Sequence, residues 1–512
     1  MPISTERRLA SPDETCALGA EIALWLRSGD FIALTGPVGA GKTVLARAII
    51  GALGSAPVEV TSPTFTMAHH YPDLRLATVH FDLYRVSGAS ECDELGLEDA
   101  LDRGVALVEW ADRLGDGLPR DRLDIALDDV SAHARQAVLT GHGEWEARLG
   151  RCLDLAHFIE AAGWAGAARQ WLVGDASTRA YERLSDAGGS RSAVLMNAPR
   201  GPDGPPVRDG VAYSRIAHLA EDVRAFVAVD RYLLARGLSA PRIHACDLVR
   251  GFLLLEDLGD RPYGGLVRSR CDLTQPYEAA IAALCRIQDS PPPSEFAAGD
   301  TAVHRLARYD LEAMLIEVEL LTDWAWPAWH GGSCPEDMRA SYRCLWSDLL
   351  SGLSGPDVLT LRDFHSPNLL WLPEREGAAR AGIIDFQDAV IGHPAYDLAS
   401  LAQDARVDLP DGMEGWIIDT WLGGRPDHVR GLTADEFLAD YALLAAQRAA
   451  KIVGIFCRLA LRDRKPGYLA HLPRVCGHLR ASLAHPRLAP LTRWFGRHFD
   501  LDREWPPLAG TA

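Results

Sequence analysis

The feature that most constrains the fold is the stretch GDFIALTGPVGAGKTVLARAIIGALG, residues 29–54. Its apolar run before the glycines predicts a buried strand. The residues after the glycines have the spacing of an amphipathic helix, which we expect to stop at Gly54. A buried strand that enters a helix through a glycine-rich loop is typical of an α/β domain. We therefore expect residues 1–142 to form such a domain.

The loop itself matches the pattern GxxxxGK[ST]. Its glycines allow backbone N–H groups to turn inward around phosphate oxygens, and the following helix directs its positive end at the anion. Lys42 can reach the β- and γ-phosphates, and Thr43 can place its hydroxyl on Mg²⁺. A glycine-rich turn without a ligand is the weaker alternative. We predict a site for ATP and Mg²⁺ formed by Gly36, Pro37, Val38, Gly39, Ala40, Gly41, Lys42 and Thr43.

Two carboxylates are placed to complete this site. Asp82 follows the apolar run VHF, and Glu109 follows GVALV, so both are expected at strand ends, where Mg²⁺ and an attacking water would lie. Either one alone could instead be a helix cap or a solvated carboxylate. TFTMAHHY and RLATVHFDLY predict a hairpin, and RLDIAL and ARQAVLTG predict closing strands.

Four segments after the loop identify a family resemblance. VTSPTFTMAHHYP, VHFDLYRV, ELGLEDAL and VALVEWADRL, in this order, resemble TsaE, the small ATPase of the bacterial machinery that makes threonylcarbamoyladenosine in tRNA. The resemblance implies that Thr43 and Glu109 are Mg²⁺ ligands and that Asp82 is a catalytic or water-orienting carboxylate. It places Thr64 in a nucleotide-sensing switch and Trp110 directly after the metal ligand. It also implies docking on a TsaD–TsaB complex, where ATP hydrolysis permits turnover.

Composition limits the remaining classes. A chain of 512 residues exceeds one hydrophobic core, and a net charge of −18 argues against direct nucleic-acid binding. We expect no membrane span, because polar residues interrupt the longest apolar helix. Ten scattered cysteines and the absence of a signal-like N-terminus predict a cytoplasmic protein with reduced thiols. The interrupted helix is DYALLAAQRAAKIVGIFCRLAL, with Gln447, Arg448, Lys451 and Arg458 as the polar positions.

A second domain follows the first. Residues 143–153 have little apolar periodicity at their start and are expected to form a linker. Within residues 154–505, short strands come first, and from about residue 274 the pattern is mainly helical. This order is the plan of a two-lobed kinase. The fold class is therefore an α/β P-loop NTPase domain followed by an α+β two-lobed protein-kinase-like domain.

The stretch LRDFHSPNLL, residues 361–370, carries the chemistry of this second domain. Asp363 and Asn368 have the spacing of a kinase catalytic loop, in which Asp363 would accept the hydroxyl proton and Asn368 would bind Mg²⁺. Asp385 ends an apolar strand 22 residues after Asp363 and is the expected second metal ligand. An Asx-capped turn beside an ordinary strand is the alternative.

The second domain resembles the aminoglycoside phosphotransferase-like kinases. GDASTRAYERL, AVLMNAPR, LLLEDLGD, LRDFHSPNLLWL and IDFQDAVIGHPAYDLASLAQDARVD are most similar to AmgK, an anomeric sugar kinase of bacterial cell-wall recycling. The resemblance implies ATP bound between lobes, with LLLEDL as a hinge beside the adenine. It also implies an N-acetylated amino sugar, N-acetylmuramate or N-acetylglucosamine, as the acceptor at C1.

Two departures from the kinase pattern matter. Leu361-Arg362 replaces the usual His-Gly, and no lysine occurs between residues 43 and 450, so Met196 stands where a nucleotide-binding lysine is expected. We expect Arg179 to neutralise the phosphates instead. Arg406 is a candidate contact for a lactyl carboxylate, with a structural or surface role as an equal alternative.

Three readings of the second domain follow from these residues. The retained Asp363, Asn368 and Asp385 favour an active sugar kinase. A nucleotide-binding scaffold without catalysis is the second reading. A kinase for another small hydroxyl compound, such as an aminoglycoside or choline, is the third.

Overall fold

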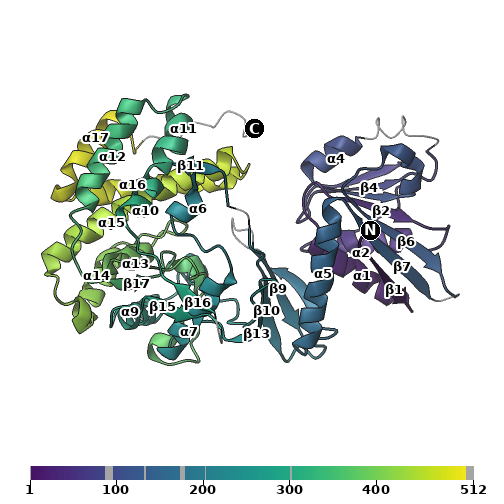
Figure 1. Cartoon of the computed structure of the whole chain (residues 1–512), viewed down its shortest axis with the longest axis horizontal. Helices are drawn as coiled ribbons and strands as arrows, with labels where there is room; N and C mark the ends of the chain where they lie inside the picture. Colours follow the sequence, from purple (N-terminus) through teal and green to yellow (C-terminus); the bar gives the residue numbers. More distant parts are fainter. Residues whose placement is uncertain are drawn as a thin grey trace. The chain divides into compact units, whose positions relative to one another are not determined.

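The computed structural model describes residues 2–86, 96–131, 134–172, 179–201, 203–299 and 302–502. The chain forms two compact units (Figure 1). The first contains Met1–Val173 and Tyr181–Ser192, and the second contains Gly174–Ala180 and Ala193–Ala512. Each unit is described by itself.

The first unit is built on a seven-stranded sheet with the order β1-β7-β6-β2-β5-β4-β3. The central strands β6, β2, β5 and β4 are parallel neighbours, whereas β1, β7 and β3 pair antiparallel at the two sides. The predicted hairpin and closing strands are confirmed by the pairs β3–β4 and β6–β7. The strands are β1 (Ser4–Leu9), β2 (Phe31–Thr35), β3 (Ala68–Tyr71), β4 (Thr78–Asp82), β5 (Val105–Glu109), β6 (Arg122–Asp129) and β7 (Arg135–His142).

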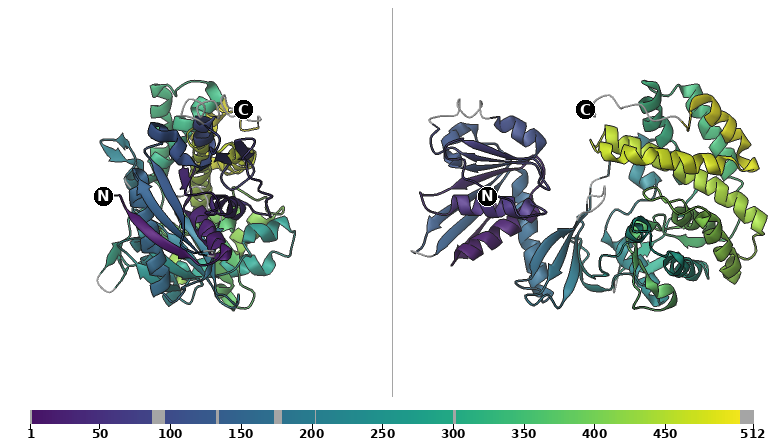
Figure 2. Two further views of the ribbon diagram at one scale, coloured as in Figure 1. Left: turned by 90° about the vertical axis from the view of Figure 1, so that its right-hand side faces the viewer. Right: turned by 180° about the vertical axis from the view of Figure 1, so that it is seen from behind.

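Helices cover both faces of this sheet, which explains why β2 and β5 are apolar at nearly every position. Ile32 and Leu34 face a core shared with α1, α2 and α5, whereas Phe31 and Ala33 face the opposite core, shared with α4 and η1. Figure 2 shows α1 and α2 side by side on the first face. The helical elements are α1 (Pro12–Trp25), α2 (Lys42–Leu53), α4 (Leu97–Arg103), η1 (Ala111–Gly117) and α5 (Glu144–Ala161).

The segment expected to be a linker is helical. Helix α5 begins directly after Gly143, so residues 144–153 form its first turns and residues 154–161 continue the same helix. Trp145 is 1% exposed and Leu149 is fully buried in the core on the α1–α2 face of the sheet. The buried side chains Trp145, Leu149 and Cys152 have the spacing of an amphipathic helix, but their small number among polar residues left the segment without a clear helical signal.

Trp145→Ala is expected to destabilise the first unit by about 3–5 kcal/mol, because it removes a fully buried aromatic ring and leaves a cavity. Hydrogen exchange of first-unit peptides in the intact chain, followed through urea, measures this loss. Trp164→Ala, at a half-buried ring after the same helix, is the control and should cost much less. A cost below about 1 kcal/mol for Trp145→Ala would show that α5 is not part of this core.

Two strands of the expected kinase domain also belong to the first unit. Strands β8 (Ala168–Leu172) and β9 (Ala180–Ser185) pair antiparallel. Arg169 on β8 donates to Glu182 at 2.7 and 3.0 Å and lies 3.8 Å from Glu21 of α1. Arg75 stacks over the ring of Trp171 at 4.5 Å. A fragment that begins near residue 154 would lose these partners, so the experiments below use the full chain.

The second unit begins with a small antiparallel sheet and continues as helices. Strand β14 (Phe252–Glu256) lies between β10 (Ser192–Asn197) and β13 (Ile243–Asp247). The antiparallel pairs β17–β20 and β18–β19 flank the stretch 361–368. These strands are β17 (Val358–Thr360), β18 (Leu369–Trp371), β19 (Ala381–Ile383) and β20 (Val390–Gly392). The short strands are β11 (Pro206–Arg208), β12 (Val211–Ala212), β15 (Glu295–Ala297) and β16 (Val303–Arg305).

The longest helix, α15 (Ala434–Leu461), runs through the helical part of the second unit and packs against α13, η2 and α16. Among the described residues, no helix meets the length and apolarity needed to cross a membrane. The remaining helices are α6 (Tyr213–Ile216), α7 (Val223–Ala235), α8 (Tyr263–Arg268), α9 (Thr274–Ile287), α10 (Leu311–Val318), η2 (Leu321–Ala325), α11 (Trp326–His330), α12 (Glu336–Leu350), η3 (Ser366–Asn368), η4 (Gly377–Arg380), α13 (Pro394–Ala402), α14 (Met413–Gly424), η5 (Asp427–Val429), η6 (Pro466–His471), α16 (Leu472–Leu483), η7 (Pro486–Leu488) and α17 (Ala489–His498).

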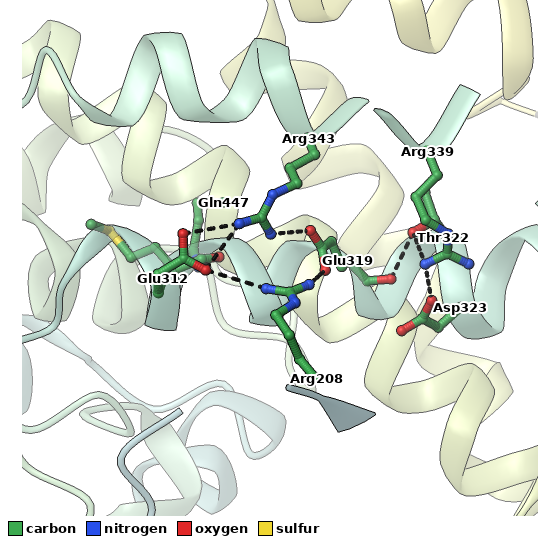
Figure 3. A network of polar contacts seen from close by, with 9 residues as sticks. Arg208, Glu312, Glu319, Thr322, Asp323, Arg339, Arg343 and Gln447 are labelled. Atoms are coloured by element: carbon green, nitrogen blue, oxygen red, sulfur yellow. Dashed lines mark hydrogen bonds and ion pairs between the residues drawn. The ribbon is translucent and has the colours of Figure 1, made fainter. Parts of the chain in front are cut away.

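An ion-pair network ties β11 to helices α10 and α12 (Figure 3). Arg208 and Arg343 each bond both Glu312 and Glu319, with Arg343 at 2.9 Å from Glu312 and 2.5 Å from Glu319. Glu319 is 3% exposed, so its charge is compensated by two guanidinium groups inside the protein. Because buried charges must be paired, this network fixes the position of β11 on the helices.

Candidate active sites

The glycine-rich loop joins β2 to α2 in the first unit, as predicted. Gly36 has φ 130°, and a Cβ there would collide with the carbonyl oxygen of Leu127 on β6. Gly41 is the N-cap of α2 with φ 100°. Both positions therefore require glycine, one for close approach and both for a positive φ.

Lys42 at the end of the glycine-rich loop stabilises the conformation of the loop. Lys42 Nζ donates to the carbonyl oxygens of Gly36 at 2.7 Å and Pro37 at 2.8 Å, and it lies 3.7 Å from the centre of the Trp110 ring. Burial lowers the pKa of Lys42, and the charges of Glu109 and Asp82 oppose this shift. The ammonium group is thus positioned inside the loop, where phosphate oxygens would be held.

The predicted metal ligands are adjacent. Thr43 Oγ1 donates to Glu109 Oε2 at 2.9 Å. The other oxygen of Glu109 lies 2.9 Å from Nε2 of His80, which is fully buried on β4. A hydroxyl beside a carboxylate is a set of hard oxygen ligands that suits Mg²⁺. His80 orients Glu109 and was not singled out from the sequence.

Asp82 is opposite Glu109 in the β4–β5 ladder. Its carboxylate accepts a hydrogen bond from Thr64 Oγ1 at 2.8 Å and another from the backbone N–H of Tyr84 at 3.1 Å. The segment that contains Thr64 is therefore attached directly to Asp82. One pocket of about 420 Å³ is lined by Val38, Gly39, Gly41, Lys42, Thr43, Val44, Thr64, Asp82, Tyr84, Glu109 and Trp110.

In the second unit, the stretch 361–368 follows β17 and is fixed by a buried carboxylate. Asp397 on α13 accepts the backbone N–H groups of Leu361 at 2.6 Å and Arg362 at 2.9 Å. Burial raises the pKa of Asp397 to about 7, and the two N–H groups oppose this shift. Arg362, which replaces the usual glycine, has φ 70°, a conformation that costs free energy for a residue with a Cβ.

The side chain of Arg362 offsets that cost. Its guanidinium is 2% exposed, donates to the carbonyl oxygen of Ala217 at 2.8 Å and pairs with Glu317. Lys451 Nζ lies 2.8 Å from the same carboxylate. Burial opposes ionisation of Glu317, but Lys451 and Arg362 hold its pKa at about 2. The backbone before Asp363 is thus anchored by a buried ionic cluster, Arg362–Glu317–Lys451.

The residues predicted for catalysis converge. Asn368 Nδ2 donates to the backbone oxygen of Asp363 at 3.1 Å and lies 3.4 Å from Asp385 Oδ2. The amide oxygen of Asn368 and the carboxylate of Asp385 form a set of hard ligands that fits Mg²⁺. In the described part of the chain, no three His, Cys, Asp or Glu side chains form a metal site. A bound Mg²⁺ would complete its coordination with water or phosphate oxygens.

The structure places Arg179 beside this pair, with Nη1 3.2 Å from Asp385 Oδ1. Met196 is 1% exposed on β10, so it lies in the core. Residues 173–178, which precede Arg179, lie outside the described residues. Arg179 is therefore a cation next to the expected metal ligand in a domain that lacks the usual lysine.

A pocket of about 180 Å³ opens beside Asp363 and contains Asn368, Asp385 and Arg406. The side chain of Asp363 is 41% exposed, which leaves its carboxylate accessible to an acceptor. His365 also lines the pocket, and burial lowers its pKa to about 4, so its ring is neutral at pH 7. Sequence reasoning missed three further lining residues: Asp404, Arg448 and Lys451.

The two sites define the class of protein: a P-loop ATPase unit joined to a phosphotransferase unit. Comparisons with known proteins agree. Residues 9–137 match the family "Threonylcarbamoyl adenosine biosynthesis protein TsaE", and residues 170–445 match the "Phosphotransferase enzyme family".

The chain is 39% identical over 357 residues to an N-acetylmuramate/N-acetylglucosamine kinase of Caulobacter vibrioides, covering 68% of this chain and 96% of the relative. It is 34% identical over 328 residues to a kinase of the same name from Pseudomonas putida, covering 62% and 84%. A TsaE protein of Bacillus subtilis is 36% identical over 137 residues, covering 27% and 85%.

The chain belongs to the TsaE family in its first part and to the phosphotransferase enzyme family in its second. The chain is an enzyme that joins a domain of an ATPase family to a domain of a kinase family in one polypeptide. The resemblances expected from the sequence motifs are confirmed.

Proposed function

We propose that the chain is bifunctional. The first domain is an ATPase that supports threonylcarbamoyladenosine modification of tRNA at position 37 by docking on a TsaD–TsaB-type complex. The second is a two-lobed kinase that transfers phosphate from ATP to the anomeric hydroxyl of N-acetylmuramate or N-acetylglucosamine. The family matches and the printed names of the relatives support both halves.

One observation carries the kinase assignment: Asp363, Asn368 and Asp385 meet at one pocket, with Arg179 beside Asp385. In the proposed reaction, Asp363 accepts the proton of the sugar hydroxyl while the hydroxyl oxygen attacks the γ-phosphorus of ATP; the bond from the γ-phosphorus to the bridging oxygen breaks and ADP leaves. Arg179 stabilises phosphate charge, in place of the absent lysine. Mg²⁺, held by Asn368 and Asp385 when bound, would neutralise phosphate charge.

The proposed adenine hinge is LLLEDL, residues 253–258. Leu258 packs with Leu370 and Leu372 of the segment after the catalytic loop, and Ile384, directly before Asp385, packs against the same cluster. A nucleotide held at the hinge would therefore rest on the same apolar support as the metal ligands. ATP and Mg²⁺ are proposed for both domains from the residues of the two sites, and a cytoplasmic location is proposed from the scattered cysteines.

The corresponding argument in the first domain rests on Lys42, Thr43 and Glu109. Lys42 and the loop would bind the phosphates of ATP, and Thr43 with Glu109 would hold Mg²⁺. Asp82, hydrogen-bonded to Thr64, would orient the attacking water and link the nucleotide to the neighbouring segment. The acidic chain then acts on tRNA through a protein partner and not by direct contact.

Full-length protein incubated with ATP, Mg²⁺ and a panel of acceptors tests the kinase proposal. Product must be measured directly, because the first domain also consumes ATP. N-acetylmuramate or N-acetylglucosamine should become phosphorylated and lose its reducing end, since a C1 phosphate blocks the aldehyde. Phosphorylation of an aminoglycoside or choline instead would assign another acceptor, and ATP binding without any product would favour the scaffold reading.

A further inference from the structure

The pocket beside Asp363 contains a cation that the proposed reaction does not use. Arg448, on α15, lines this pocket and is 6% exposed. Its guanidinium donates one hydrogen bond, to the carbonyl oxygen of Gln403 at 2.9 Å. Within the part of the chain that the structure describes, no carboxylate forms an ion pair with it. A guanidinium has five N–H donors, so most of the hydrogen-bonding capacity of Arg448 is unused.

The carboxylates near Arg448 already have other hydrogen-bond or ion-pair partners. Asp404 accepts the backbone N–H and the hydroxyl of Ser366 at 2.9 and 2.6 Å, and its other oxygen accepts the backbone N–H groups of Arg406 and Val407. Asp397 interacts electrostatically with Arg448, but its oxygens accept the backbone N–H groups of Leu361 and Arg362. Glu317 is taken by Arg362 and Lys451. Since no described carboxylate is hydrogen-bonded to Arg448, its guanidinium has free donors for an anion that enters the pocket.

We propose that Arg448 binds the carboxylate of an acidic amino-sugar acceptor, and this inference rests on the proposed kinase function. N-acetylmuramate carries a carboxylate on its lactyl ether, whereas N-acetylglucosamine has a hydroxyl there. A planar guanidinium can hold a carboxylate through two parallel hydrogen bonds. Arg448 is then the residue that determines preference for the acidic sugar, with the half-buried Arg406 beside it.

The anion that binds Arg448 is better supplied by the acceptor sugar than by the phosphates of ATP. Arg179 and the expected metal ligands Asn368 and Asp385 already serve the nucleotide phosphates. Arg448 comes from a different element, and the apolar side chains of Ile452, Ile455 and Phe456 line the pocket from the same helix. Apolar side chains beside a buried cation suit the carbon skeleton and the single charge of a sugar acid more closely than a polyphosphate.

The test compares the two sugars with the full-length protein and its Arg448→Gln and Arg448→Lys variants. For Arg448→Gln, kcat/KM for N-acetylmuramate should fall about 10- to 100-fold through KM, because a charge-assisted bidentate contact is lost. For N-acetylglucosamine, it should stay within about threefold, and KM for ATP should not change. Arg448→Lys, which keeps the charge, should give a smaller loss. Arg462→Gln, at an exposed position just after the same helix, is the control.

Three results would overturn the inference. An unchanged kcat/KM for both sugars would show that Arg448 does not bind the carboxylate. Equal losses with both sugars would assign it a structural role, and a raised KM for ATP would assign it to the transferred phosphate. If the unmodified protein phosphorylates neither sugar, the proposed function itself fails, and the inference falls with it.

Discussion

Asp363→Asn is expected to lower kcat/KM for the sugar acceptor by about 10³-fold, because the amide cannot accept the proton of the attacking hydroxyl. The exchange preserves size, and the contact with Asn368 uses the backbone oxygen of Asp363, so the loop should keep its shape. The carboxylate is partly exposed, and among the described residues no Arg or Lys forms an ion pair with it, so stability should change little. Direct measurement of the phosphorylated sugar gives the rate.

The matched control for this substitution is Asp411→Asn, at an exposed aspartate outside the pocket. ATP binding should be equal in both variants, because Asp363 is proposed to act on the acceptor and not on the nucleotide. Turnover within tenfold of the unmodified protein in Asp363→Asn would remove Asp363 from the role of base. A loss of ATP binding in the same variant would instead point to a wider disturbance of the metal ligands.

Local sequence patterns predicted those parts of both sites whose geometry depends on residues close together in the sequence. The loop from Gly36 to Thr43 has a positive φ at three glycines, and only a glycine-rich sequence allows that conformation. Asp82 and Glu109 end adjacent parallel strands, so their proximity follows from the strand pattern. The short spacing between Asp363 and Asn368 likewise keeps the two residues close together. Asn368 ends the short helix η3, and strand β18 follows directly.

Contacts between distant segments were not predictable in the same way. Glu317 joins Arg362 and Lys451, which are 45 and more than 130 residues away, and no single-sequence pattern pairs them. The sequence contains one sign of these contacts, because Gln447, Arg448 and Lys451 interrupt an otherwise apolar helix. From the sequence alone, these residues argue only against a membrane span. In the structure, Arg448 and Lys451 line the pocket beside Asp363, and Gln447 donates to the carboxylate of Glu317.

The helical state of residues 144–153 was not predicted, for a related reason. The start of α5 has few apolar side chains, yet Trp145 and Leu149, four residues apart, enter the core of the first unit. The strands β8 and β9 have ordinary amphipathic sequences, but Arg169 and Trp171 find their partners on the first unit. Burial by a neighbouring segment, and not local sequence, decides where the compact unit ends.

The presence of two ATP-using sites in one chain makes selective inactivation informative. Each proposed site has its own base or water-orienting carboxylate, its own pair of metal ligands and its own cation for phosphate. Asp82, Glu109 and Lys42 are proposed for the first site, and Asp363, Asp385 and Arg179 are proposed for the second. A substitution in one set should therefore leave the chemistry of the other set intact.

Lys42→Ala is expected to reduce ATP hydrolysis, measured with a TsaD–TsaB-type complex, by at least about 100-fold. The ammonium lies inside the loop where the phosphates are proposed to bind, and removing one such preorganised donor typically costs two to three orders of magnitude. The substitution also removes the bonds to the carbonyl oxygens of Gly36 and Pro37 that hold the loop. Phosphate release in the presence of the complex gives the rate.

Lys465→Ala is the control, because Lys465 is exposed and far along the chain from the loop. It should hydrolyse ATP at the rate of the unmodified protein. Unchanged hydrolysis in Lys42→Ala would exclude the loop as the ATPase site. Sugar phosphorylation in Lys42→Ala should remain within about threefold of the unmodified protein. A larger loss would show that the two reactions are coupled, because Lys42 has no proposed part in the kinase chemistry.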